Sequence, residues 1–329
     1  MRGRLLAGVA VLGLASMASV SAGDPWKDSA QYAIEYRVDL TALAATENDK
    51  VRVWVPLPVE TTDQTILSTD IDSPWASRMV RDSNGNRVVY LEGEGAASKP
   101  LVLRTVVQRR PSHGTSKDLV SKDGPDDPSR FGKPARMIPL EGLIEQVAKQ
   151  EARGLTGEDE KVRAYYDYVV ANMAYDKRGT GWGQGNATWA CTNKRGNCTD
   201  FHSLFIGMAR SQGIPARFLI GLPVPGKDGG VIPGYHCWAE FWDESAGWVP
   251  VDSSEANKRD MADEYYGHLP NDRVEFTTGR DLVLEPPQAG EPLNYFIYPY
   301  VEIAGEPAGD VPATFAFERQ PPERPTSGS

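Results

Sequence analysis

One cysteine in this sequence has a setting that favours chemistry. Cys198 follows Gly196-Asn197 and begins an apolar pattern that predicts an amphipathic helix over residues 198–212. Gly213 then suits the left-handed residue that closes such a helix. A cysteine in the first turn of a helix lies at the positive end of the helix dipole, which favours the thiolate. Cys198 is therefore the candidate nucleophile.

A thiolate nucleophile works with a base, and two histidines are candidates. His202 lies four residues after Cys198 on the same predicted helix, but no carboxylate is placed beside it by local geometry. His236 begins a predicted strand, and the midpoint between His236 and Asp252 is residue 244, inside the turn 243–247. Residues opposed across an antiparallel pair lie on one face with Cβ atoms about 5 Å apart. The spacing therefore favours Asp252 as the group that orients His236.

Together Cys198, His236 and Asp252 have the residue types of a nucleophile, a base and an orienting acid. Taken alone, His236 is more typical of a core histidine and Asp252 of an aspartate at a strand end. Their combination with Cys198 favours a triad. A turn centred nearer Ser245 would weaken the pairing. Asp200 is interpreted as a first-turn acid favoured by the helix dipole.

The elements that must position these residues fall into two regions. Residues 23–112 contain short alternating runs and an Asn-Gly turn, which predict a β-rich domain with a small β-sandwich over 28–112. Residues 113–135 are rich in Pro, Ser, Asp and Gly and predict a linker or mobile loop. The expected strands of the first region are 31–40, 51–55, 87–91 and 101–108.

Helical and strand patterns alternate in the second region, residues 136–304, which we interpret as the catalytic domain. One helix is expected from about Pro139, and another after Thr156 as its cap. The glycine-rich stretch 175–186 is a loop without a phosphate-binding pattern. The expected strands are 217–222, 235–242, 248–251, 279–284 and 295–303. Residues 305–329 are interpreted as a proline-rich tail.

The amino terminus predicts export. Arg2 and Arg4 precede the apolar run Leu5–Leu14, and Val20-Ser21-Ala22 has the small-x-small pattern of a cleavage site. Residues 1–22 are therefore expected to be a signal peptide of a secreted or periplasmic protein. Its removal would take away two positive charges and change the net charge from −10 to about −12. That balance argues against nucleic-acid partners and anionic membranes, and the apolar run is too short for a membrane span.

Cys191, Cys198 and Cys237 are too few for a disulfide scaffold. If Cys198 is the reactive thiol, Cys191 and Cys237 could form a disulfide, and three reduced thiols are an equally weighted alternative. Their spacing does not suit a metal, and no cofactor or calcium loop is indicated.

Four segments resemble the core of the transglutaminase-like superfamily over roughly residues 136–260. They are Gly196–Phe201, Gly213–Arg217, Tyr235–Glu240 and Gly247–Asp252, and the order Cys, His, Asp with intervals of 38 and 16 residues is similar as well. The resemblance implies an α+β fold, with a papain-like core of a helix packed on an antiparallel sheet, preceded by the β-sandwich. It also implies that Cys198 is the nucleophile, His236 the base and Asp252 its orienter.

Two further expectations follow from this resemblance. The oxyanion hole needs the Cys198 backbone N–H and one more donor, for which the indole of Trp182 is a candidate and Trp189 its rival. Cys237 departs from the small residue that the family more often has. Because His236 and Cys237 alternate along a strand, Cys237 is expected to face away from the site.

The expected function is thiol-dependent acyl transfer on peptide or side-chain amides, with hydrolysis favoured over cross-linking because no amine pocket is indicated. The substrate would be a protein, a peptide or a cell-envelope polymer. The alternatives are a protein-glutamine cross-linking enzyme and a non-enzymatic module that binds a peptide or polymer on the same fold. The sequence does not indicate the oligomeric state or a need for proteolytic activation.

Overall fold

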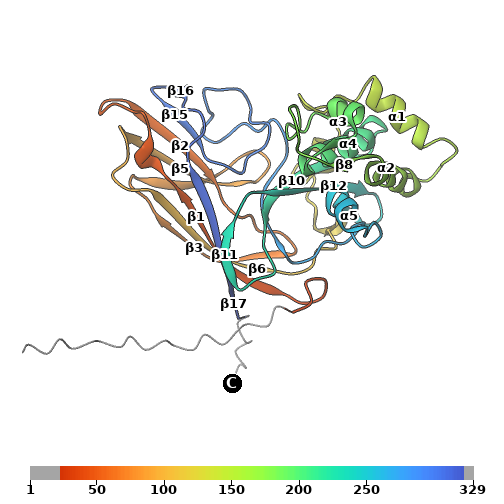
Figure 1. The fold of residues 1–329 in the computed structure, drawn as a ribbon, viewed down its shortest axis with the longest axis horizontal. Coiled ribbons are helices and arrows are strands. Elements are labelled where there is room, and N and C mark those ends of the chain that lie inside the picture. The colour runs from red at the N-terminus through yellow and green to blue at the C-terminus, as the bar shows by residue number, and fades with distance from the viewer. Residues whose placement is uncertain (1–22, 322–329) are drawn as a thin grey trace, which may run out of the picture.

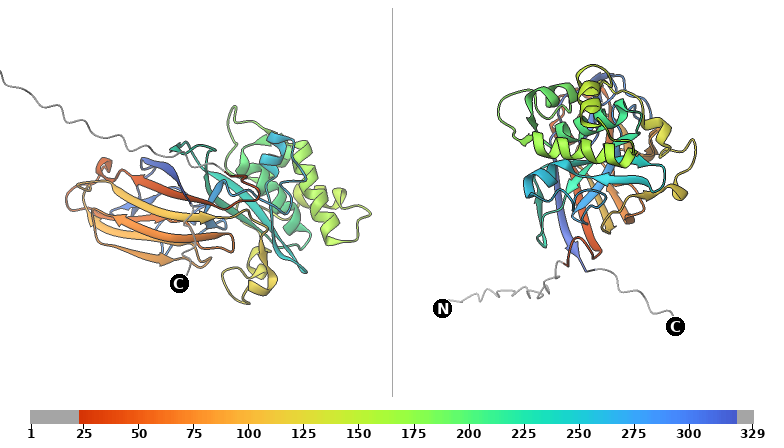
Figure 2. Two further views of the ribbon diagram at one scale, coloured as in Figure 1. Left: turned by 90° about the horizontal axis from the view of Figure 1, so that it is seen from below. Right: turned by 90° about the vertical axis from the view of Figure 1, so that its right-hand side faces the viewer.

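A computed structural model describes residues 23–321, so the predicted signal peptide at residues 1–22 lies outside the described residues. The chain forms a β-sandwich and a smaller α+β domain that lie side by side (Figures 1 and 2). The fold class is thus the α+β arrangement that the sequence predicts. No helix within residues 23–321 is both long and apolar enough to cross a membrane.

The sandwich consists of two five-stranded antiparallel sheets that share one apolar core. Strand β1 illustrates why the sequence forms it, because Tyr32, Ile34, Tyr36 and Val38 are buried at every second position. One sheet has the order β11 (Gly229–Ile232), β17 (Ala313–Gln320), β1 (Ala30–Val38), β6 (Leu101–Arg109), β3 (Gln64–Asp72). The other has the order β16 (Glu306–Pro307), β15 (Tyr300–Ile303), β2 (Lys50–Pro56), β5 (Arg87–Glu94), β4 (Ser77–Arg81).

The end of the described chain belongs to the sandwich, which corrects the prediction of a catalytic domain to residue 304 and a tail over 305–329. Strand β15 pairs with β2, and β17 pairs along the whole length of β1. Phe315 and Phe317 of β17 are buried, so this strand supplies apolar side chains to the core. Without β17, the hydrogen-bonding edge of β1 would be open. Figure 1 shows β17, in blue, beside the early strands.

The α+β domain is built on a third antiparallel sheet, in which β10 and β12 are central. Helix α4 packs on β10 and β12, while α1, α2 and α3 contact it from other sides. The sheet has the order β14 (Arg273–Thr278), β10 (Ala216–Pro223), β12 (His236–Asp243), β13 (Gly247–Val251), β7 (Thr115–Ser116). The helices are α1 (Leu143–Glu151), α2 (Glu158–Asn172), α3 (Ala187–Asn193), α4 (Cys198–Ser211), α5 (Ser253–Arg259). The short elements are η1 (Leu40–Ala42), η2 (Lys117–Leu119), η3 (Pro128–Phe131), β8 (Ala174–Tyr175), β9 (Arg195–Gly196).

Several expected boundaries move. No strand forms at residues 279–284, and the nearest strand is β14, which ends at residue 278. Of the strand expected at 295–303, only residues 300–303 form a strand, β15. Helix α2 is capped at Gly157, whose N–H donates to Glu160 Oε2 at 3.2 Å, rather than at Thr156. Helix α4 was expected to bury one face, but residues 198–210 are buried throughout. Helices α1, α2 and α3 cover the face of α4 that was expected to be exposed.

The expected linker, residues 113–135, is ordered and packs on the α+β domain. Its strand β7 pairs with the edge strand β13. The indole Nε1 of Trp248 donates to the Asp126 carbonyl at 2.9 Å, and Arg217 forms an ion pair with the Asp126 carboxylate. The segment therefore satisfies buried polar groups of the domain, which explains why it is not the mobile loop that its composition suggests.

Candidate active site

Cys198 is the first residue of α4 and is only 2% exposed. The side chain of Asn197 caps the helix by accepting from Thr199 N at 2.9 Å, and Asp200 completes a capping box by accepting from Asn197 N at 2.9 Å. The thiol therefore lies where the helix dipole favours negative charge, as the sequence predicted.

Asp200 does more than favour the helix dipole. Its carboxylate also accepts from the backbone N–H groups of Gly183 at 2.6 Å and Gly185 at 3.0 Å. At Gly185, which has φ of +60°, a Cβ would lie 2.6 Å from Ser203 Oγ. A glycine is needed there for both the backbone conformation and the close approach. Asp200 thus holds the glycine-rich loop against the start of α4.

His236 and Asp252 meet directly. His236 Nε2 lies 2.6 Å from Asp252 Oδ2, and both side chains are buried. Asp252 caps α5, because its Oδ1 accepts from Glu255 N at 2.9 Å and from Ser254 Oγ at 3.0 Å. Since these bonds fix the carboxylate, the imidazole it contacts is fixed as well.

The register that brings them together differs from the expected one. Trp242 pairs with Trp248 and Ala239 with Val251, so the turn is centred at residue 245 rather than 244. Asp252 is therefore not aligned with His236. It is aligned with the position two residues after His236 on β12. An offset of two residues keeps both side chains on one face, whereas an offset of one would not. Asp252 also leaves the strand to cap α5, which lets its carboxylate reach the imidazole.

The electrostatics of the site favour a thiolate and an imidazolium. Burial raises the pKa of Cys198, but hydrogen bonds with Cys237 and His236 and the charge of His236 outweigh it and hold the pKa well below 9.0. Burial lowers the pKa of His236, but the charge of Asp252 and hydrogen bonds to Asp252 and Cys198 raise it from 6.5 to about 10. A thiolate beside an imidazolium is the reactive form of a nucleophilic cysteine.

A second cation, Arg273, supports the carboxylate. Its Nη1 donates to Asp252 Oδ2 at 2.7 Å, and its guanidinium lies 5.5 Å from the centre of the Trp238 ring. Despite complete burial, which raises it, the pKa of Asp252 is held well below 3.8 by His236, His202 and Arg273. Arg273 could not be predicted from the sequence, because no spacing rule connects β14 to the turn after β13.

His202 also borders the site, although it does not take the place of His236. Its Nδ1 lies 2.7 Å from the Cys198 carbonyl oxygen, and its Nε2 is 3.4 Å from Asp252 Oδ1 without hydrogen-bond geometry. Local geometry places no carboxylate beside His202, but the tertiary fold brings Asp252 to it.

The two candidate tryptophans are placed differently from what the resemblance implies. Trp182 Nε1 donates to the Gly179 carbonyl within its own loop at 3.0 Å. Trp189 lies in α3, with the Arg195 guanidinium 5.7 Å from the centre of its ring. Burial raises the pKa of Tyr175, and the nearby Cys198 backbone N–H acts in the opposite direction. This tyrosine is therefore a side chain close to the expected oxyanion donor.

Tyr235 is a second tyrosine that sequence reasoning missed. Its hydroxyl lies 3.2 Å from Asn197 Nδ2 and 3.3 Å from Thr199 Oγ1, on either side of Cys198 in the chain. Its ring is 5.7 Å from that of Tyr295, and Tyr298 is 43% exposed beside it. Aromatic rings with polar ends thus border the start of α4.

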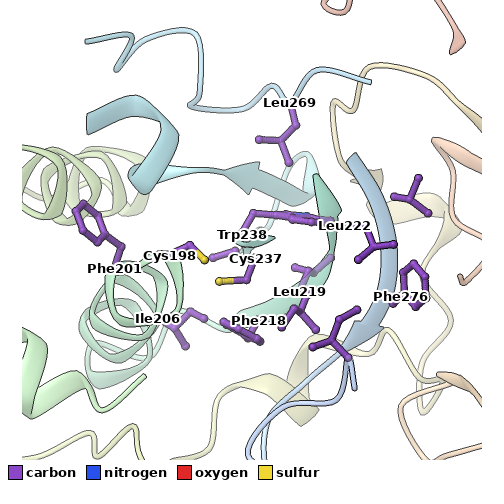
Figure 3. Close-up of a cluster of buried hydrophobic side chains, with 14 of the residues drawn as sticks. Cys198, Phe201, Ile206, Phe218, Leu219, Leu222, Cys237, Trp238, Leu269 and Phe276 are labelled. Carbon is purple, nitrogen blue, oxygen red and sulfur yellow. The ribbon is translucent and has the colours of Figure 1, made fainter. Parts of the chain in front are cut away.

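All three cysteines are free thiols, so the structure contains no Cys191–Cys237 disulfide. Cys237 does not face away from the site as expected, because its side chain points to the start of α4, where its sulfur faces that of Cys198 (Figure 3). Helix α4 packs on the face of β12 that Cys237 occupies, while His236 reaches Cys198 from the end of the strand. Within residues 23–321 no group of three or more His, Cys, Asp and Glu side chains could hold a metal ion.

Comparison with known proteins relates this part of the chain to a family. Residues 145–253, which contain most of α1, all of α2 to α4 and the three candidate residues, match the family model described as the transglutaminase-like superfamily. The resemblance that the four segments predicted is thus confirmed over these residues. An uncharacterized protein of Haemophilus influenzae is 24% identical over 314 residues, which cover 82% of this chain and 85% of that protein.

One solved structure shows the same fold. A proposed cysteine protease of Cytophaga hutchinsonii matches with a TM-score of 0.60 and 17% identity, covering 92% of this chain and 93% of its own. The match includes the sandwich as well as the α+β domain, because it spans nearly the whole chain. The periplasmic domain of TgpA from Pseudomonas aeruginosa aligns over 76% of this chain and 97% of its own, at 15% identity and a TM-score of 0.36.

Proposed function

We propose that this protein is a thiol-dependent acyl-transfer enzyme that acts on peptide or side-chain amides through the triad Cys198, His236 and Asp252. The observation that carries the proposal is the 2.6 Å contact between His236 and Asp252 beside a buried thiol at a helix start. The composition of residues 1–22 supports a secreted or periplasmic location.

In the proposed reaction the Cys198 thiolate attacks the amide carbonyl, and the His236 imidazolium gives its proton to the leaving amine. This leaves an acyl thioester on Cys198 and a neutral imidazole. His236 then takes a proton from the incoming water or amine, whose attack on the thioester carbonyl releases the acyl group and restores the Cys198 thiolate and the His236 imidazolium. Asp252 keeps Nε2 of the ring occupied throughout, so that Nδ1 faces the reacting atoms.

We favour water over an amine as the acceptor. Water is abundant, whereas cross-linking needs a site that holds an amine close to the thioester, and no residue of this chain identifies such a site. The rings of Tyr235 and Tyr295 near the start of α4 suit an extended peptide or glycan-bearing polymer better than a small amine. Protein-glutamine cross-linking is the alternative reaction on the same triad.

The competing class is a module that binds a peptide or polymer without reacting with it. Such a module has no use for a lowered thiol pKa, so the reactivity of Cys198 separates the two classes. We would label the reduced protein with iodoacetamide across pH and quantify each cysteine separately in tryptic peptides. We expect Cys198 to react well below pH 9, and His236→Ala to move its reaction to the pH of an ordinary thiol, because the imidazolium is lost.

Cys191 is an internal reference in the same labelling experiment, because it is buried in α3 and contributes nothing to the triad. If Cys198 reacts no faster than Cys191 near neutral pH, and Cys198→Ala changes no biochemical property, the enzyme proposal is wrong. Incubation with a glutamine-containing protein and a fluorescent primary amine then separates the reactions. Peptide or ammonia release without label supports hydrolysis, and Cys198-dependent label supports cross-linking.

A further inference from the structure

Two thiols from different elements meet at the active site. Cys198 begins α4 and Cys237 is the second residue of β12, and their sulfurs face each other in the buried cluster of Figure 3. The two thiols also shift each other's pKa, that of Cys198 downward and that of Cys237 upward. Cys237 is fully buried, and its sulfur lies 3.7 Å from Thr199 Oγ1 and 3.8 Å from His202 Nδ1. The mechanism proposed above does not use Cys237.

We propose that Cys198 and Cys237 form a redox pair, in which a hydroperoxide oxidises Cys198 and Cys237 resolves the product as a reversible disulfide. The oxidation step rests on the thiolate character assigned to Cys198 in the proposed function. The thiolate attacks the peroxide O–O bond, giving the sulfenic acid Cys198–SOH and, with one proton, an alcohol or water. The Cys237 sulfur then displaces hydroxide from Cys198–SOH, forming an S–S bond, and the hydroxide leaves as water with the proton released by Cys237.

The electrostatics of the pair order these steps. While Cys198 is a thiolate, burial and the neighbouring negative sulfur raise the pKa of Cys237 well above 9.0, so only one of the two sulfurs is charged. Oxidation of Cys198 to a sulfenic acid removes that negative charge, and the raised pKa of Cys237 then falls. Burial still opposes ionisation of Cys237, but without the Cys198 charge the second thiol is a better nucleophile than before.

Access for the oxidant follows from the proposed reaction. Cys198 is 2% exposed, but an amide substrate must still reach its sulfur, and a hydroperoxide is smaller than any such substrate. Cys191 is not an alternative partner. Its sulfur lies in α3 with Lys194 Nζ at 3.9 Å, and it does not contribute to the pKa of either Cys198 or Cys237. The disulfide would leave Cys198 unable to act as a nucleophile. It would also prevent oxidation of Cys198 to the sulfinic acid, which thiols cannot reduce.

The chain offers a direct test, because trypsin places each cysteine in a separate peptide. Cys191 falls in residues 179–194, Cys198 in 196–210 and Cys237 in 228–258. The purified protein is reduced with dithiothreitol, the reductant is removed, and the sample is treated with hydrogen peroxide and alkylated without reduction. We expect the 196–210 and 228–258 peptides joined by a disulfide and the free-thiol count reduced from three to one.

Two variants complete the experiment. Cys237→Ala should still be oxidised at Cys198 but should accumulate the sulfinic or sulfonic form, so that dithiothreitol no longer restores a reactive thiol. Cys191→Ala is the matched control and should behave like the natural protein. A free Cys237 beside an over-oxidised Cys198 in the natural protein, or a disulfide between two molecules, would overturn the redox pair while leaving the enzyme proposal intact. Failure of iodoacetamide to label reduced Cys198 would overturn both.

Discussion

Two clusters of buried charge lie on the sheet of the α+β domain, and their hydrogen bonding differs. The catalytic cluster, comprising Cys198, His236, Asp252 and Arg273, converges on one carboxylate, to which both His236 and Arg273 donate. The junction cluster comprises Arg109, Arg217, Glu240 and Glu275. It lies where this sheet meets the sandwich, since Val59 and Gln64 bond to the backbone of Glu275.

The junction cluster contains one ion pair, and Glu275 lies beside it. Arg217 forms an ion pair with Glu240 at 2.7 Å, and its guanidinium lies 4.3 Å from the centre of the Trp248 ring. Burial and the neighbouring Glu240 carboxylate raise the pKa of Glu275 from 4.5 to about 7, although Arg109 and Arg217 oppose the shift. In the function proposed above, buried charge serves reactivity in the first cluster, by keeping a thiolate available, whereas in the second it lies where two domains meet.

The largest expected effect comes from changing one carboxylate to an amide in each cluster and comparing the two variants. Asp252→Asn keeps an acceptor for the cap of α5 but removes the charge that holds His236 protonated. We expect the Cys198-dependent release of amine or ammonia to fall roughly 10⁴-fold, as when the orienting acid of a triad is amidated. Glu240→Gln, the matched amide change in the junction cluster, should leave that rate within a factor of a few. Equal losses in both variants would show that the clusters are not functionally distinct.

A second prediction concerns stability alone. Arg217→Met removes a buried cation and leaves Glu240 without its partner, which should lower the free energy of unfolding by about 3–5 kcal/mol. Urea denaturation of the natural protein and the variant measures the difference. The pH dependence of Cys198 labelling below the unfolding transition should be unchanged, because Arg217 contacts none of the catalytic cluster. A shifted labelling profile would mean that the junction tunes the thiol.

The smallest effect depends on pH. The pKa of Glu275 is about 7 in the folded protein, and its ordinary value is 4.5. Between pH 4.5 and pH 7 the folded chain therefore keeps a proton on Glu275 that the unfolded chain has released. The free energy of unfolding should therefore fall as pH rises from about 4.5 to 7, by at most about 3 kcal/mol. Glu275→Gln should match the natural protein near pH 4.5 and be the more stable of the two above pH 7. Urea titrations at both pH values decide this, and a constant difference would rule out titration of Glu275.

Much of the candidate site could be predicted from the sequence because it depends on local patterns. The start of α4, the glycine that closes it and the hairpin of β12 and β13 are each specified by residues close together in the chain. These patterns are sufficient to predict Cys198, His236 and Asp252 as candidate residues. The register error was tolerated because a two-residue offset keeps a side chain on the same face.

Other features were decided only by tertiary structure, because their partners are far apart in the chain. The sequence around Phe315 was predicted to be a tail. It forms a strand because it pairs with β1, where Phe315 lies opposite Tyr36, 279 residues earlier in the chain (315 − 36). Arg273 and His202 reach Asp252 from β14 and α4, and no periodicity predicts such contacts. Alternation along β12 could not show which face α4 covers, and that packing alone brings Cys237 to the nucleophile.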